Sequence, residues 1–209
     1  MGTITFALAK GRLAVEAMRL LESVGITCQD MHQKSRKLIF ENENLQYKFF
    51  LAKATDVPTY VEYGAADCGV VGKDTLLEEG RHLYEALDLG FGKCRIVVAG
   101  MPGSADQLKK GNDFRIATKY PNIAADYFYH QKKQTVEIIK LNGSVELGPL
   151  VGLADFVVDI VETGSTLAEN GLVILEEICP VSARLVVNRA SMKMEHKRIS
   201  QLIGRMKGQ

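Results

Sequence analysis

The chain has 209 residues, of which 46% are hydrophobic and 24% charged, and its formal net charge at pH 7 is +1. This composition is typical of a globular protein with one large or two small domains, and the near-zero charge favours neither a nucleic-acid nor a membrane partner. No apolar run approaches the roughly 20 residues needed to cross a bilayer. Because residues 1–6 also lack the pattern of a secretory signal, we expect a cytoplasmic protein.

The cysteines and histidines are scattered along the chain and form no ligand motif. The cysteines contain no Cys-x-x-Cys pair, and we expect them to be reduced and mostly buried. The histidines lack the spacing of a zinc site. The sequence therefore predicts no metal site of the protein's own, and any metal is expected as Mg²⁺ bound through substrate phosphates.

Apolar runs and helical periodicity alternate through the N-terminal half. Residues 4–9 are expected to form a strand that leads through Lys10-Gly11-Arg12 into an amphipathic helix ending at Gly25. Further strands are expected over residues 35–40, 47–52 and 66–72, with helices beginning at Asp56 and Thr75.

Two groups of cations in this half invite a functional interpretation. Lys10 and Arg12 flank a glycine at the carboxyl end of a predicted strand, where open α/β sheets bind ligands, and a polyphosphate would suit them. A solvated surface turn is an equally good interpretation of this pair. Arg36, together with Lys34 and Lys37, has the pattern of a solvated strand edge.

The C-terminal half restarts the same alternation after the flexible joint Gly90-Phe91-Gly92. Strands are expected over 94–99, 114–118, 135–140, 154–162, 173–178 and 183–188, with helices beginning at Pro121 and over 191–206. Pro180 is expected to separate the last two strands. This alternation predicts an α/β fold with mostly parallel sheets, and the joint indicates two lobes.

The stretch from Ala154 to Leu172 combines a buried strand, two acids and a loop of small residues. Asp159 and Glu162 lie near the end of the strand, and Thr163-Gly164-Ser165-Thr166 precedes a short helix that stops at Asn170-Gly171. Loop amides, hydroxyls and a helix start together suit a phosphate, while a carboxylate before them suits ribose hydroxyls. These features fit a ribose 5-phosphate, and the alternative is a strand-to-helix turn that merely needs a glycine.

The pattern acid-x-x-x-Thr-Gly-x-Thr resembles the ribose-phosphate loop of phosphoribosyltransferases. The longer string from Gly143-Ser144-Val145-Glu146 through Asp159 to Leu172 resembles the ATP phosphoribosyltransferase family. Additional motifs in the family's order are found at residues 8–12, 56–58, 66–72 and 115–120. Several separated motifs in one order are far more specific than a single loop.

The resemblance implies a two-lobed, periplasmic-binding-protein-like fold with a central cleft, lobe I comprising residues 1–93 and 180–209 and lobe II residues 94–179. It implies transfer of the phosphoribosyl group from phosphoribosyl pyrophosphate to N1 of ATP, with release of pyrophosphate, as the first step of histidine biosynthesis. Lys10, Arg12 and Arg36 would face the pyrophosphate or the ATP phosphates. The implied substrate-binding residues are Glu146, Asp159, Glu162, Thr163, Gly164, Ser165 and Thr166.

The chain resembles the short form of the family, which lacks a C-terminal histidine-binding domain. The resemblance therefore implies a homodimer of the catalytic chain and a hetero-octamer with a regulatory subunit similar to histidyl-tRNA synthetase. Two alternatives remain at this point. One is a phosphoribosyltransferase that acts on a free base, and the other is a non-catalytic solute-binding module of the same fold.

Overall fold

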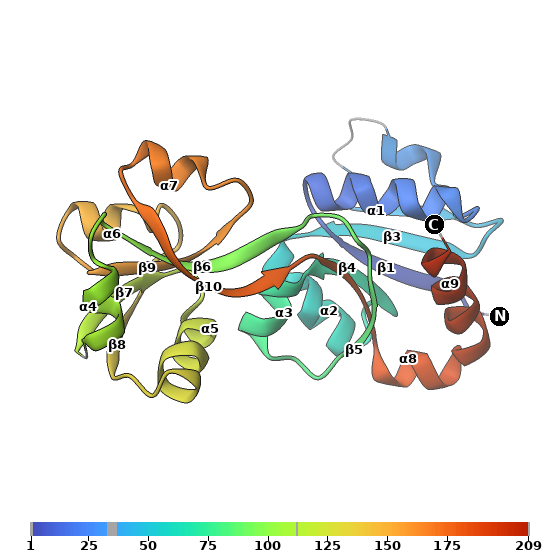
Figure 1. The fold of residues 1–209 in the computed structure, drawn as a ribbon. Coiled ribbons are helices and arrows are strands. Elements are labelled where there is room, and N and C mark those ends of the chain that lie inside the picture. The colour runs from blue at the N-terminus through green and yellow to red at the C-terminus, as the bar shows by residue number, and fades with distance from the viewer. Residues whose placement is uncertain (1, 33–36, 112, 209) are drawn as a thin grey trace. The chain divides into compact units, whose positions relative to one another are not determined.

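The computed structural model describes residues 2–32, 37–111 and 113–208. It divides into two compact units, unit 1 with Met1–Gly92 and Ser182–Gln209 and unit 2 with Lys93–Val181 (Figure 1). Each unit is built on one β-sheet with helices packed against it, so the predicted α/β class is confirmed. Among the described residues, no helix has the length and apolar character needed to span a membrane.

Unit 1 contains a six-stranded sheet with the order β2-β3-β1-β4-β11-β5. Strands β3, β1 and β4 are parallel, whereas β2 and β11 run antiparallel to their neighbours. The strands are β1 (Ile4–Ala9), β2 (Ile39–Asn42), β3 (Tyr47–Ala52), β4 (Cys68–Gly72), β5 (Tyr84–Asp88) and β11 (Ala183–Val187). The last strand returns to this sheet from the far end of the chain.

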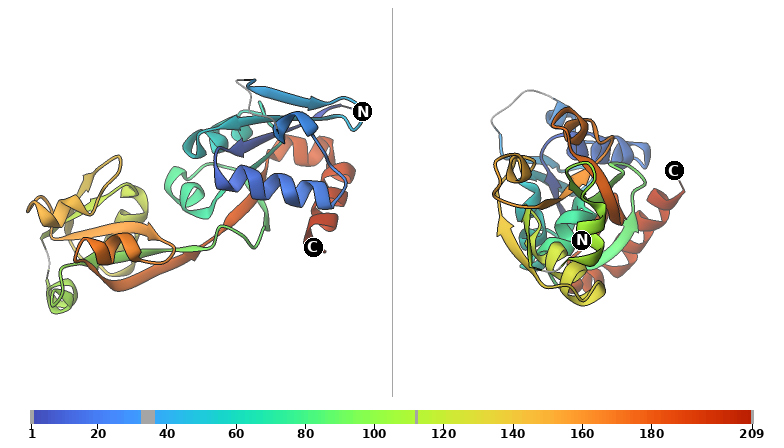
Figure 2. Two further views of the ribbon diagram at one scale, coloured as in Figure 1. Left: turned by 90° about the horizontal axis from the view of Figure 1, so that it is seen from above. Right: turned by 60° about the vertical axis from the view of Figure 1, so that its left-hand side comes forward.

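The helices of unit 1 cover both faces of that sheet. They are α1 (Arg12–Ser23), α2 (Val57–Glu62), α3 (Lys73–Glu79), α8 (Arg189–Met194) and α9 (His196–Lys207), with 3₁₀ turns at Gln29–His32 and Ala54–Asp56. Figure 2 shows α1 lying along the sheet. Its buried residues Ala17, Met18 and Leu21 join one core cluster with Phe6 and Leu8 of β1, as expected for an amphipathic helix.

Unit 2 contains a five-stranded sheet with the order β10-β6-β9-β7-β8. Its strands are β6 (Cys94–Gly100), β7 (Phe114–Thr118), β8 (Val136–Lys140), β9 (Phe156–Val161) and β10 (Val173–Val181). Its helices are α4 (Ala105–Lys110), α5 (Pro121–Ala125), which continues as a π-helical segment over Asp126–Gln131, α6 (Leu147–Leu150) and α7 (Ser165–Glu169). Successive residues of the central strand β9 face opposite sides of this sheet, so they belong alternately to two different core clusters.

The prediction of mostly parallel sheets needs a correction, because both sheets are mixed. Two of the five strand pairings in unit 1 are parallel, namely those of β1 with β3 and with β4. In unit 2 only the pairings of β7 with β8 and β9 are parallel, out of four. Alternation in sequence does not reveal the direction in which a strand enters its sheet. β11 runs antiparallel to both of its neighbours in unit 1, and β10 runs antiparallel to β6 in unit 2.

Several elements differ from those predicted, among them β2, which was expected over residues 35–40 and is found at Ile39–Asn42. Pro180 does not end a strand, because β10 lies at the edge of its sheet, where a missing N–H need not face a partner. The helix expected over 191–206 is two helices, which break at the non-helical Glu195. Strand β5 was not predicted, since its five residues are largely exposed and show little apolar alternation. Residues 35 and 36 of the strand expected over 35–40 lie outside the described residues.

Candidate functional site

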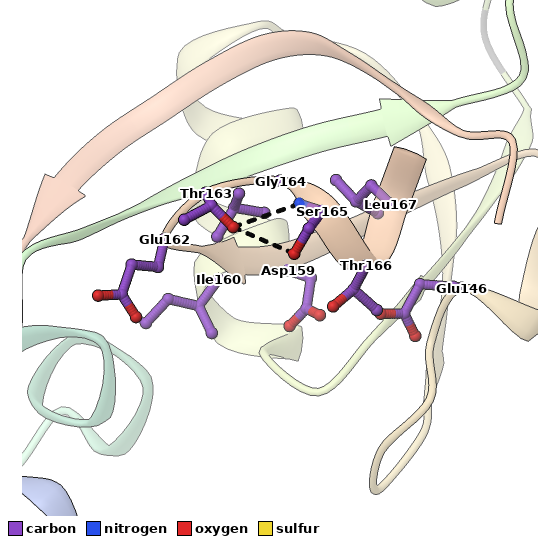
Figure 3. Close-up of a pocket in the computed structure, with 10 residues that line it drawn as sticks. Glu146, Asp159, Ile160, Glu162, Thr163, Gly164, Ser165, Thr166 and Leu167 are labelled. Atoms are coloured by element: carbon purple, nitrogen blue, oxygen red, sulfur yellow. Dashed lines mark hydrogen bonds between the residues drawn. The ribbon is translucent and has the colours of Figure 1, made fainter. Parts of the chain in front are cut away.

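A cavity of about 310 Å³ opens in unit 2 where β9 ends and α7 begins. That volume lies at the lower end of the range of small-molecule sites, about 300 to 1,000 Å³. Its lining residues come from the end of β9, the loop after it, the first turn of α7 and the residue before α6 (Figure 3). They are Glu146, Asp159, Ile160, Val161, Glu162, Thr163, Gly164, Ser165, Thr166 and Leu167.

Asp159 lines this cavity from the central strand β9, and it is half-buried. Its neighbours two residues away on either side, Val157 and Val161, are buried in one apolar cluster, so the carboxylate shares an apolar face. The pKa of Asp159 is raised to about 6, mainly by this burial and to a lesser degree by the negative charge of Glu146. The Ile160 N–H and the positive charge of Lys119 oppose the shift. A carboxyl group with such a pKa changes its charge near the pH at which enzymes work.

The loop after β9 presents hydroxyl and amide groups to the cavity. Gly164 has φ 87° and ψ 3°, a left-handed conformation that favours glycine, and it directly precedes α7. The hydroxyls of Thr163 and Ser165 lie 3.1 Å apart, and the Ser165 N–H donates to Thr163 Oγ1 at 3.4 Å (Figure 3). Because the first amides of a helix lack carbonyl partners within it, this loop is able to bind an anion.

Glu146 reaches the same cavity from a different element. It immediately precedes α6, which packs against β9. A Cβ at Gly148 would come within 2.7 Å of the Ala117 side chain, so this glycine allows α6 to approach β7 closely. Figure 3 shows Glu146 and Thr166 on one side of Asp159 and Glu162 on the other. The predicted residues Glu146, Asp159 and Glu162, together with the loop of residues 163–166, therefore line one cavity.

The predicted cations lie in unit 1 or outside the described residues. Lys10 and Arg12 are exposed and flank Gly11 at the carboxyl end of β1, where the chain turns into α1. Gly11 has φ 99° and ψ −147°, a conformation that residues with a side chain avoid. Arg36 lies outside the described residues, so the structure does not describe its position.

Sequence reasoning did not single out several residues at this site. Ile160, Val161 and Leu167 line the cavity and were regarded only as parts of a buried strand and helix. The sequence did contain a signal for these residues. A loop that binds phosphate lies between the end of a strand and the start of a helix, and the residues on both sides of the loop face the bound ligand. Among the residues that the structure describes, no group of three or more His, Cys, Asp or Glu side chains is arranged to hold a metal ion.

The family model for ATP phosphoribosyltransferase (HisG) matches residues 53–208 of the chain. The chain belongs to the ATP phosphoribosyltransferase family. A relative with that name from Lachnoclostridium phytofermentans is 68% identical over 201 residues, which cover 96% of this chain and 94% of the relative. One from Lachnospira eligens is 63% identical over 205 residues, covering 98% and 95% of the two chains.

Solved structures agree with this assignment. A chain of the ATP phosphoribosyl transferase (HisG:HisZ) complex from Thermotoga maritima matches with a TM-score of 0.82 and 34% identity, covering 99% of this chain and 98% of that one. Its fold is periplasmic-binding-protein-like, and the prediction of that fold is confirmed. Tv2483, solved with bound L-arginine, matches with a TM-score of 0.61 and 12% identity, a likeness in fold alone.

The reaction of this ATP phosphoribosyltransferase family is the transfer of the phosphoribosyl group from phosphoribosyl pyrophosphate to N1 of ATP, and it is the activity of this chain. It is the first step of histidine biosynthesis and requires a divalent metal ion. Membership in this family decides against the two alternatives, a free-base phosphoribosyltransferase and a non-catalytic binding module.

Proposed function

We propose that the cavity at the end of β9 is the phosphoribosyl site of this transferase. Thr163, Gly164, Ser165 and Thr166 bind the 5-phosphate through hydroxyls and amides. Asp159 accepts hydrogen bonds from the ribose hydroxyls, with Glu162 beside them and Glu146 toward the nucleotide. The observation that carries this proposal is the meeting of the loop, Asp159 and Glu146 in one cavity, although Glu146 precedes the loop by 17 residues.

The reaction makes distinct demands on the two ends of phosphoribosyl pyrophosphate. The C1–O bond to pyrophosphate breaks while N1 of ATP forms a bond to C1, and positive charge develops on the sugar ring, as in glycoside hydrolysis. Nearby carboxylates such as Asp159 stabilise that charge. Lys10, Arg12 and Arg36 are proposed to bind the negative leaving group or the ATP phosphates, where guanidinium groups bind bidentately.

We assign Mg²⁺ as the divalent ion and expect it to arrive on the substrate phosphates. The oxygen donors of Asp159 and Glu146 are of the type that Mg²⁺ accepts, but two carboxylates do not complete its six-coordinate shell. Phosphate oxygens and water would supply the remaining positions. When bound, the ion neutralises charge on the departing pyrophosphate.

We further propose the assembly and location of the enzyme. Units 1 and 2 correspond to its lobes I and II. The Thermotoga maritima structure is a HisG:HisZ complex, and this supports a regulatory subunit for the present chain. We propose that this subunit is similar to histidyl-tRNA synthetase, that the chain forms homodimers which assemble with it into a hetero-octamer, and that the enzyme works in the cytoplasm. Light scattering of the purified chain with and without the co-expressed subunit tests this assembly.

The site assignment is tested with ATP, phosphoribosyl pyrophosphate and Mg²⁺, following both absorbance of the N1-substituted adenine and release of pyrophosphate. Thr166→Ala removes a loop hydroxyl, and we expect kcat/KM for phosphoribosyl pyrophosphate to fall by about tenfold, the value of one hydrogen bond to a charged group. Thr135→Ala removes an exposed threonine hydroxyl in unit 2, outside the cavity lining, and is the matched control. Equal kinetics for the two variants would contradict the assignment of the loop.

A further inference from the structure

Two half-buried cysteines lie on neighbouring strands of unit 2, although 85 residues of sequence separate Cys94 from Cys179. Cys94 begins β6 and Cys179 lies near the end of β10, and these two strands are paired antiparallel. Figure 1 shows β6 and β10 running side by side. Both cysteines are thiols in the structure. The fold therefore brings together two thiols that are far apart in the sequence.

Both thiols belong to the same face of the sheet. Cys94 alternates with the buried Ile96 and Val98 along β6, and all three belong to or pack against one core cluster. Cys179 packs against that same cluster, which also contains Val181 of β10. The two thiols therefore lie on one side of the paired strands, at the margin of an apolar core.

The strand register makes the two cysteines diagonal neighbours. Cys94 is opposite Val181 and Cys179 is opposite Ile96, so each cysteine is two residues from the other's partner. Diagonal neighbours on paired strands are roughly 7 to 8 Å apart, and their Cβ atoms are somewhat closer. A disulfide usually joins Cα atoms that are about 4.4 to 6.8 Å apart, so bridging this pair requires an approach of about 1 Å.

The local structure of the two strands allows that approach. The register shifts between Glu177 and Cys179, which marks a β-bulge, and a bulged strand bends and twists more than a regular one. β10 is also the edge strand of its sheet, so it is paired on one side only. On β6, the pairing with β9 begins at Arg95, one residue after Cys94. A disulfide formed here would be strained, and strained disulfides are more easily reduced.

The other two cysteines of the chain differ from this pair in burial. Cys28 and Cys68 are buried in the core of unit 1. Burial raises the pKa of both of these thiols, and the thiolate is the form that reacts with oxidants. Cys94 and Cys179 are half-buried, so an oxidant in solution reaches them more readily. The cysteines therefore divide into a shielded pair in unit 1 and an accessible pair in unit 2.

We propose that Cys94 and Cys179 form a reversible redox site, at which hydrogen peroxide converts the two thiols to a disulfide that closes unit 2 into one covalent loop. One thiol loses its proton, and its thiolate attacks an oxygen of the peroxide. The O–O bond breaks, the sulfur becomes a sulfenic acid, and the departing hydroxide takes up the proton to form water. The second thiol then attacks the sulfenic sulfur, which forms the S–S bond and releases a second water molecule. The two sulfurs are oxidised, and the peroxide is reduced by two electrons.

The position of this bond gives it a consequence for stability. Unit 2 runs from Lys93 to Val181, so the disulfide would join the chain close to the first and the last residue of the unit. A long closed loop has less conformational entropy when it is unfolded, and this favours the folded state. Oxidation would therefore stabilise the unit that carries the cavity. This inference goes beyond the transferase reaction and does not depend on the assignment of the cavity.

The first test maps the disulfide in the purified full chain. The wild type is treated with hydrogen peroxide, unfolded and blocked with N-ethylmaleimide, and its peptides are identified by mass spectrometry. We expect a link between Cys94 and Cys179 within one chain, with Cys28 and Cys68 blocked as thiols. Reduced glutathione should reopen the link, because strained disulfides yield to it. Sulfinic acid without a link, or links between separate chains only, would overturn the proposal.

The matched control moves one thiol to the directly opposite position. Val181→Cys in a Cys179→Ser background places a thiol opposite Cys94. Directly opposite Cβ atoms are about 4.5 to 5.5 Å apart, so this pair should link at least as readily as the natural one. If the control links and the wild type does not, the natural diagonal is too long and the inference fails. If neither links, peroxide does not oxidise this end of the sheet, and the inference fails as well.

A second test measures the effect of the bond on stability. Thermal unfolding of the peroxide-treated wild type should move upward by about 5 °C relative to the reduced protein, since strain offsets part of the gain from loop closure. Cys94→Ser and Cys179→Ser should lose this upward shift, whereas Cys28→Ala should keep it. A linked wild type whose unfolding temperature stays the same or falls would overturn the stabilising role.

Discussion

The Lys10-Gly11-Arg12 turn of unit 1 and the cavity of unit 2 have the same architecture but opposite charge. Each lies where a buried strand ends and a helix begins, and each contains a glycine with positive φ, Gly11 at 99° and Gly164 at 87°. The first turn presents two exposed cations, whereas the second presents carboxylates and hydroxyls. Backbone geometry alone therefore does not specify the ligand, and the side chains at the strand end distinguish a proposed pyrophosphate site from a sugar site.

We expect the largest effect on activity from Asp159, the carboxylate that distinguishes the cavity of unit 2 from the cationic turn of unit 1. Asp159→Asn keeps the shape of the side chain but removes its negative charge from the cavity. We expect kcat/KM to fall on the order of 10² to 10³, the loss typical of a group that stabilises a charged transition state. Steady-state kinetics above pH 7 measure it. A fall below threefold would show that the carboxylate of this strand end does not act on the sugar.

The same substitution should stabilise the folded protein. The pKa of Asp159 is raised to about 6 in the folded state, so the folded protein holds the proton on this carboxyl more tightly than the unfolded chain does. The stability that this protonation contributes is fully present below the pKa of the unfolded chain, and it is lost as pH rises through about 6. At pH 8 the buried charge costs about 3 kcal/mol, from a shift of about 2 pKa units above the ordinary value of 3.8, and Asp159→Asn relieves this cost. Urea unfolding should show this gain at pH 8 and a smaller one at pH 5. The exposed Asp126→Asn is the control, and a gain independent of pH would contradict this account.

The cationic region is tested by Arg12→Lys, which keeps the charge but loses the fork of donors. If Arg12 binds phosphate groups bidentately, kcat/KM should fall by roughly tenfold, equal to about 1.4 kcal/mol. Arg19→Lys, two helical turns further along α1, is the matched control. Unchanged kinetics in Arg12→Lys would show that this turn contributes only a diffuse positive charge.

We expect the smallest effect, a difference in stability, when Gly11 and Gly164 are each replaced by asparagine. With ψ −147°, Gly11 lies near a region of backbone conformation used almost only by glycine, whereas Gly164, with ψ 3°, is close to the left-handed helical region that asparagine tolerates. We expect Gly11→Asn to cost about 1 kcal/mol more stability than Gly164→Asn. Denaturant midpoints measure the difference, and the reverse order would show that neighbouring packing outweighs backbone strain.

Much of the fold and of the site could be read from local signals. The strand with Asp159 and the loop of residues 163–166 were predicted because an apolar run followed by small residues has few other structures available. Strand β5 was not predicted, because the sheet supplies its partner β11 from about 100 residues further along the chain. Pro180 was placed outside a strand, because the sequence does not indicate that β10 is an edge.

The sequence by itself determined the α/β class, the family and the chemistry available at each strand end. Only the tertiary structure brought Glu146 to the loop and to Asp159, because the packing of α6 against β9 sets these neighbours. The register of β7 with β9 joins residues 40 apart in the chain. Local periodicity carries no information about such pairings, and the packing of two core clusters on opposite faces of one sheet decides them.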